Sequence, residues 1–249
     1  MPKIKFSLLS IIGGLTLLSS SAYAGVDAEV SYILNTLLFL IGGFLVMWMA
    51  AGFAMLESGL VTSKSVATIA AKNIGLYSIA GLMFWLVGYN LAYGIPEGGF
   101  IGSFLPWSDA SAVDTGYSDG SDWFFQMVFC ATTCSIVSGT LAERIKIWPF
   151  FLFFAILAGV IYPIEMGWQW GGGHLAAAGF SDFAGSTLVH SAGAAAALAG
   201  AILLGPRLGR FTDSGEAAPM APFASSSIPL ATLGVFILWM GWFGFNGGS

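Results

Sequence analysis

The segment Val30–Leu56 reads VSYILNTLLFLIGGFLVMWMAAGFAML and contains no charged side chain. About 20 apolar residues are enough for a helix to cross the hydrocarbon core of a bilayer. The whole chain has a similar character, since 57% of its residues are hydrophobic and only 8% are charged. Ordinary soluble domains carry roughly 25% charged residues. The sequence therefore predicts an all-α, polytopic membrane protein.

Five further uncharged intervals follow this segment, each apolar enough to supply a membrane span. The last interval runs to Ser249, the end of the chain. We therefore predict five complete spans and a sixth that stops near its end. The predicted spans cover about residues 30–56, 73–95, 123–142, 147–166, 183–206 and 226–249.

The N-terminus has the pattern of a secretory signal peptide. Lys3 and Lys5 precede the apolar run Phe6–Leu18, and the small-residue site Ala22-Tyr23-Ala24 follows. This order of a basic, an apolar and a cleavage region indicates removal of residues 1–24, which leaves one domain, 25–249. An uncleaved first helix is the alternative, but its apolar core is short for a span.

Basic residues occur in alternate connections between the predicted spans. The second connection, which includes Glu97 and Asp109, has no Lys or Arg, and neither has the fourth. Basic loops stay in the cytoplasm, so we predict a protein of the inner (plasma) membrane with its mature N-terminus outside the cytoplasm. The basic residues of the first, third and fifth connections are Lys64, Lys72, Arg144, Lys146, Arg207 and Arg210.

Several kinds of site are not indicated. The net charge of −5 and the lack of a basic patch argue against a nucleic-acid partner. Cys130 and Cys134 lie in one apolar run and are predicted to pack between helices, and two histidines without a CxxC motif do not suggest a metal site or another cofactor. Glu57 and Glu143 end the first and third spans, where charges are easily hydrated, so we predict structural roles.

His190 is the most informative polar residue. It lies eight residues after Asp182, and only small or apolar residues follow it as far as Leu204. An ionisable group at that depth is costly and usually faces a cavity, although an interhelical hydrogen bond is the alternative. Asp182 is predicted to cap the helix that contains His190. His174 is predicted to be solvated in an outer loop.

Aromatic residues suggest what such a cavity would bind. The segment Gly167–His174 reads GWQWGGGH, which suits a sharply bent vestibule lined by indole rings. An indole face attracts cations by up to about 2 kcal/mol when both are desolvated. An interfacial aromatic belt is the alternative. Phe129 and Phe245 fit a lipid-facing position and a core position equally well.

Five motifs together resemble the ammonium transporter family, the Amt/Mep/Rh group. The most specific is Asp182–His190, which reads DFAGSTLVH. Four more occur in the order of the family and extend the resemblance over the mature sequence. They are FAMLESGLV at 53–61, GTLAER at 139–144, GPRLGRF at 205–211 and GWFGFNGGS at 241–249.

The resemblance implies a role for each matching residue. Trp170, Ser249 and Phe129 match an outer site that recruits the ammonium ion, and Phe129 with Phe245 matches a pair of rings that closes the pore. His190 and Trp242 match residues of the pore wall. Asp182 matches a carboxylate needed for conduction, with a structural or ion-stabilising role. The implied function is transport or channelling of ammonium, and not an enzymatic reaction.

The resemblance also implies the architecture and partners of the whole protein. The family has eleven spans in two inverted five-helix repeats, so this chain is expected to be a fragment with the first repeat and the start of span six. The second pore histidine of the family has no counterpart here. A homotrimer and a cytoplasmic PII-type regulatory protein are the implied partners. An ammonium sensor, with the same fold joined to a signalling domain, is the alternative function.

Overall fold

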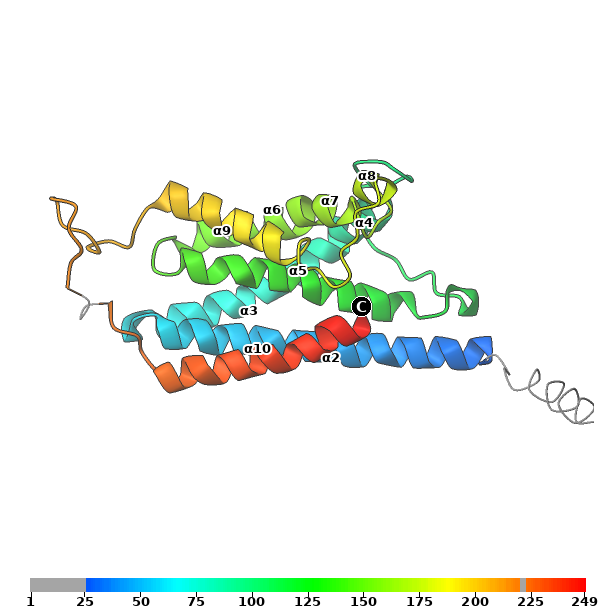
Figure 1. Cartoon of the computed structure of the whole chain (residues 1–249), viewed down its shortest axis with the longest axis horizontal. Helices are drawn as coiled ribbons and strands as arrows, with labels where there is room; N and C mark the ends of the chain where they lie inside the picture. The colour runs from blue at the N-terminus through cyan, green and yellow to red at the C-terminus, as the bar shows by residue number, and fades with distance from the viewer. Residues whose placement is uncertain (1–25, 220–222) are drawn as a thin grey trace, which may run out of the picture.

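The computed structural model describes residues 26–219 and 223–249, so the predicted signal peptide, 1–24, lies outside the described residues. The helices run side by side along the long axis of the molecule (Figure 1). In chain order the elements are α2 (Ala28–Leu60), η1 (Ser63–Ser65), α3 (Val66–Met83), η2 (Phe84–Gly88), α4 (Tyr89–Tyr93), η3 (Val113–Thr115), α5 (Asp119–Leu141), α6 (Ile147–Ile156), η4 (Leu157–Ile161), α7 (Tyr162–Gly167), α8 (His174–Ala177), α9 (His190–Leu204) and α10 (Ile228–Gly248).

The described chain confirms the prediction of an all-α polytopic protein. Five helical stretches are long and apolar enough to cross a membrane: α2, the run from η1 to α4, α5, the run from α6 to α7, and α10. The remaining apolar helix, α9, has 15 residues and begins at His190 rather than at Phe183. We call the end of the bundle that carries α8 the α8 end (Figure 1).

α5 forms the centre of the bundle. It lies between α9 and the pair formed by α2 and α10, and it also packs against α3 (Figure 1). Cys130 and Cys134 on α5 are fully buried, and both thiols are free. The prediction that these cysteines pack between helices is thus confirmed.

α2 and α10 approach each other through glycines. A Cβ atom added to Gly234 of α10 would lie 2.5 Å from the backbone nitrogen of Leu56 and 2.6 Å from the carbonyl oxygen of Gly52. A Cβ at Gly59 would lie 2.5 Å from the backbone nitrogen of Ala231. Small residues at such contacts let two membrane helices pack backbone to backbone, which is what holds α10 on α2.

We expect Gly234→Ala to lower the free energy of unfolding by about 1–3 kcal/mol, the usual range for overpacking. The added methyl group would meet backbone atoms, which cannot rotate away as a side chain can. Gly247→Ala on the same helix is the matched control, because a Cβ there has no atom within 4 Å. Thermal unfolding in detergent measures both, and equal unfolding temperatures would contradict the close contact.

A buried polar network joins three helices at the end of the bundle opposite α8. The Lys72 ammonium of α3 lies 3.0 Å from Glu57 Oε2 of α2 and donates to the Ser138 carbonyl oxygen of α5 at 2.8 Å. Asn73 Nδ2 and Ser138 Oγ donate to the same Glu57 oxygen. Glu57 is 5% exposed and pairs with Lys72, so it has the predicted structural role. It is a buried, paired charge and not a hydrated charge at the end of a span.

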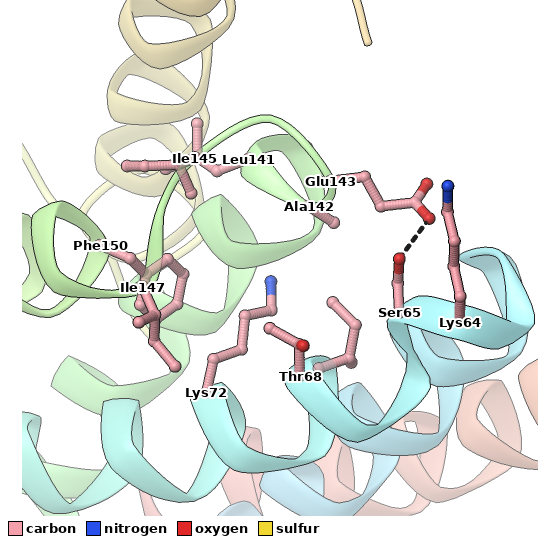
Figure 2. A pocket seen from close by; sticks show the side chains of 11 residues that line it. Lys64, Ser65, Thr68, Lys72, Leu141, Ala142, Glu143, Ile145, Ile147 and Phe150 are labelled. Carbon is pink, nitrogen blue, oxygen red and sulfur yellow. Dashed lines mark hydrogen bonds between the residues drawn. The ribbon is translucent and has the colours of Figure 1, made fainter. Parts of the chain in front are cut away.

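A cavity of about 250 Å³ borders this network at Lys72 (Figure 2). Lys72 reaches into it from α3, while Lys64 and Ser65 line it from the preceding turn. Ser65 Oγ donates to Glu143 Oε1 at 2.7 Å, and Arg207 forms an ion pair with Glu143 Oε2 at 2.9 Å. Glu143 therefore ties the connections after α2, α5 and α9 together.

Candidate functional site

A line of five aromatic and imidazole rings runs through the bundle. Trp170 meets Phe129 edge to face with centroids 5.9 Å apart, and Phe129 stacks on Phe245 at 3.8 Å. His190 follows, 5.8 Å from Phe245, and its ring stacks on Trp242 at 5.7 Å. The rings come from α5, α9, α10 and the loop after α7, so only the folded chain brings them together.

Phe129 and Phe245 are core residues and not lipid-facing ones, since each is 1% exposed. Their rings lie nearly parallel, with an interplanar angle of 26°. Trp242 differs, because 38% of its surface is exposed in the described chain. The stacked rings of Phe129 and Phe245 thus lie in the middle of the line, with Trp170 on one side and His190 on the other.

Asp182 organises the turn that leads into α9. Its two carboxylate oxygens accept hydrogen bonds of 2.8–3.1 Å from four consecutive backbone N–H groups, those of residues 185–188. Burial disfavours the charged form, but these donors outweigh it and hold the pKa of Asp182 below its ordinary value. Gly185 has a positive φ of 85°, so the chain turns here and α9 starts only at His190.

Trp170 is fixed to the same turn. Its indole Nε1 donates to the Asp182 carbonyl oxygen at 2.7 Å, which satisfies the polar edge of a half-buried ring. This hydrogen bond uses the edge of the indole and does not involve its two faces. An indole held by its edge in this way offers a face to a cation.

His190 has one ring nitrogen occupied. Its Nδ1 lies 3.0 Å from the Gly185 carbonyl oxygen. Because a carbonyl oxygen only accepts, Nδ1 carries the hydrogen of the neutral ring, and Nε2 keeps its lone pair. The half-buried imidazole is therefore oriented with Nε2 available as an acceptor.

His174 is not simply solvated as predicted. Its half-buried ring stacks on Phe100 with centroids 4.2 Å apart and meets Trp168 at 5.0 Å. His174 begins the short helix α8, and backbone hydrogen bonds from His174 to Gly99 and from Leu175 to Trp168 hold the three rings together. His174 has no contact in the line from Trp170 to Trp242, so it belongs to a separate cluster.

A cavity of about 330 Å³ opens beside the Trp170 end of the line. Trp170, Phe129 and Ser249, which the sequence predicts to form one recruitment site, all line it. Ser249 Oγ donates to the Phe245 carbonyl oxygen at 2.7 Å. The other lining residues are Phe39, Tyr89, Tyr93, Tyr117, Asp122, Phe125, Gln126, Phe183 and Gly248.

Comparison with known proteins identifies the family of this fold. The sequence pattern described as the Ammonium Transporter Family matches residues 37–249. The chain belongs to the ammonium transporter family. It is a multi-pass membrane protein, and its named relatives are transporters rather than enzymes.

Two relatives show the extent of the likeness. The chain is 42% identical over 227 residues to a putative ammonium transporter of Synechocystis sp., which covers 89% of this chain and 50% of that protein. It is 43% identical over 225 residues to the ammonium transporter Amt2 of Archaeoglobus fulgidus, which covers 84% of this chain and 46% of that protein. The chain therefore spans about half the length of the curated relatives it matches.

Known structures of the ammonium transporter family share the fold. A structure of a sensor Amt protein superimposes with a TM-score of 0.78 at 37% identity, covering 86% of this chain and 54% of that one. A crystal structure of Candida albicans Mep2 superimposes with a TM-score of 0.74 at 26% identity, covering 90% and 50%.

Sequence reasoning missed part of the cavity wall. Tyr89, Tyr93 and Tyr117 come from α4 and the following loop, and no local motif marks them as neighbours of Trp170. Asp122 ends the second connection, which has no basic residue, and no sequence motif gives it a role in binding. The sequence does mark Asp122 as an acid directly before the apolar run of α5. It does not show which residues lie opposite Asp122 in the folded bundle.

Proposed function

We propose that the full-length protein conducts ammonium across the membrane. The ammonium ion binds in the cavity lined by Trp170, Phe129 and Ser249, and the stacked rings of Phe129 and Phe245 separate this site from His190. Asp182 holds the turn that positions Trp170 and starts α9. The observation that carries the proposal is the unbroken line of rings from the cavity beside Trp170 to the half-buried imidazole of His190.

Electrostatics favours ammonia as the species that passes the rings. A bare cation in an apolar passage pays several kcal/mol of lost hydration. Neutral ammonia avoids this penalty, and a potassium ion, which has no proton to lose, cannot. His190 Nε2 can accept a hydrogen bond from ammonia and take part in a separate relay of the proton.

The proposed setting follows from the distribution of basic residues. The α8 end faces outward and carries the cavity, while the opposite end, with Lys64, Lys146 and Arg207, faces the cytoplasm of a cell whose inner membrane holds the protein. A homotrimer with one pore in each subunit and a PII-type regulator at the cytoplasmic face complete the proposal. Exposed apolar residues along α2, such as Phe44 and Trp48, suit contact with lipid or a neighbouring subunit.

Trp170→Leu tests the recruitment site. In the full-length protein we expect KM for methylammonium uptake to rise about tenfold with Vmax nearly unchanged, because the cation loses a ring face worth up to about 2 kcal/mol. Trp168→Leu is the matched control, since Trp168 does not line the cavity and its Nε1 donates to the Phe100 carbonyl oxygen. Unchanged saturation in Trp170→Leu would rule out recruitment at this ring.

A sensor is the second candidate function, favoured by the likeness to a sensor Amt protein. The same cavity would then bind ammonium and pass the signal to a further domain. Sequencing of the gene past codon 249 distinguishes the two. A kinase or cyclase domain after the last span would favour the sensor, and its lack would favour transport alone.

A further inference from the structure

We propose that Asp122 is a further cation-binding residue of the cavity beside Trp170, so that an entering monovalent cation meets a carboxylate as well as aromatic faces. The inference deepens the proposed function and rests on it. Nothing in the family motifs of this chain includes Asp122, which lies seven residues before Phe129, outside them.

Charge and burial carry the inference. Asp122 is 7% exposed, and it is the one charged residue among the described residues that line the cavity. The ion pairs found in the described part of the chain are Glu57 with Lys72 and Glu143 with Arg207, both at the other end of the bundle. A buried carboxylate without a cationic partner carries a large desolvation cost, which a bound cation would offset.

The hydrogen bonds of Asp122 leave room for such a cation. The Tyr89 hydroxyl donates to Oδ2 at 2.6 Å, which fixes one oxygen. Gln126 Nε2 approaches Oδ1 at 3.4 Å, which is a weak contact. Asp122 also lies in the first turn of α5, where the helix dipole favours a negative charge. The carboxylate is thus held in place through Oδ2, with Oδ1 largely free.

The remainder of the wall defines the class of ligand. A divalent ion such as Mg²⁺ or Ca²⁺ favours several charged oxygen ligands, and this wall offers one carboxylate, with the neutral side chains of Gln126 and Ser249, among aromatic rings. Aromatic faces attract weakly hydrated monovalent cations, and an ammonium or alkylammonium ion also donates hydrogen bonds to Asp122 Oδ1. The rings of the wall are Phe39, Tyr89, Tyr93, Tyr117, Phe125, Phe129, Trp170 and Phe183.

The test uses methylammonium uptake by the full-length protein in proteoliposomes. Asp122→Asn keeps the size of the side chain and an oxygen for the Tyr89 hydroxyl. We expect its KM to rise about tenfold, the change that 1.4 kcal/mol of lost attraction produces, with Vmax within twofold. Asp122→Glu keeps the charge, so we expect its KM to be lower than that of Asp122→Asn. Asp119→Asn removes a charge from the same helical turn outside the cavity wall and should leave KM unchanged.

Two outcomes would overturn the inference. One is a KM of Asp122→Asn within twofold of the parent value, measured on a variant whose gel-filtration elution and unfolding temperature match those of the parent. The other is a fall in Vmax at constant KM, which would assign Asp122 a purely structural role. Trp170→Leu in the same assay separates the two proposals: if it raises KM and Asp122→Asn does not, only the role of Asp122 fails. If neither raises KM, the recruitment site itself is wrong.

Discussion

Lys72→Met is expected to lower the free energy of unfolding by about 3–5 kcal/mol, the range for breaking one half of a buried ion pair. Lys72 is 4% exposed, and its ammonium lies 3.0 Å from Glu57 Oε2 and 5.0 Å above the Phe150 ring. Removing the ammonium leaves the Glu57 carboxylate buried with only the neutral donors Asn73 and Ser138. The carboxylate would then lose its counter-ion in a setting where water cannot replace it.

The double substitution Glu57→Gln with Lys72→Met separates charge from packing. Replacing both members of a buried pair by neutral groups is often close to neutral for stability, so we expect the double variant to regain most of the loss. Lys64→Met is the matched control: Lys64 lines the same cavity but is exposed, and its change should stay within about 0.5 kcal/mol (Figure 2). Chemical unfolding in detergent gives all three values, and a double variant no better than Lys72→Met would refute this account.

The helices could be predicted from the sequence because bilayer hydrocarbon excludes charge. Gaps between charged residues therefore mark the spans without any knowledge of packing. The start of α9 was missed for a physical reason: the apolar stretch begins at Phe183, but Asp182 captures four backbone N–H groups and Gly185 turns the chain. Hydropathy does not register a turn made by uncharged residues around one carboxylate.

The direction of single side chains could not be predicted. In a membrane helix both the lipid-facing and the buried side are apolar, so periodicity gives little information about Phe129 or Phe245. Trp170 and His190 were recognisable because a polar or aromatic group in that setting needs a partner. The contact between Tyr89 and Asp122 joins residues 33 positions apart, and only the packed bundle reveals it.

Under the proposed function, His190→Ala is expected to lower sharply the selectivity of the full-length protein for ammonium over potassium. The imidazole ring fills the space between Trp242 and Phe245, and its Nδ1 is tied to Gly185. Alanine would leave a gap there large enough to admit water, and water lowers the several kcal/mol penalty that keeps cations out of an apolar passage. Each 1.4 kcal/mol is worth tenfold, so we expect the ratio of methylammonium to potassium flux to fall by about a hundredfold or more.

His174→Ala serves as the control for this prediction, because it removes the other histidine of the chain from a ring cluster outside the line. Flux of each ion into proteoliposomes is measured under the same membrane potential, so that a change in selectivity is separated from a change in driving force. A fall in selectivity for His190→Ala alone would assign the barrier to the His190 imidazole. If potassium exclusion survived in His190→Ala, the stacked Phe129 and Phe245 rings would have to supply the whole barrier, and His190 would have no part in selection.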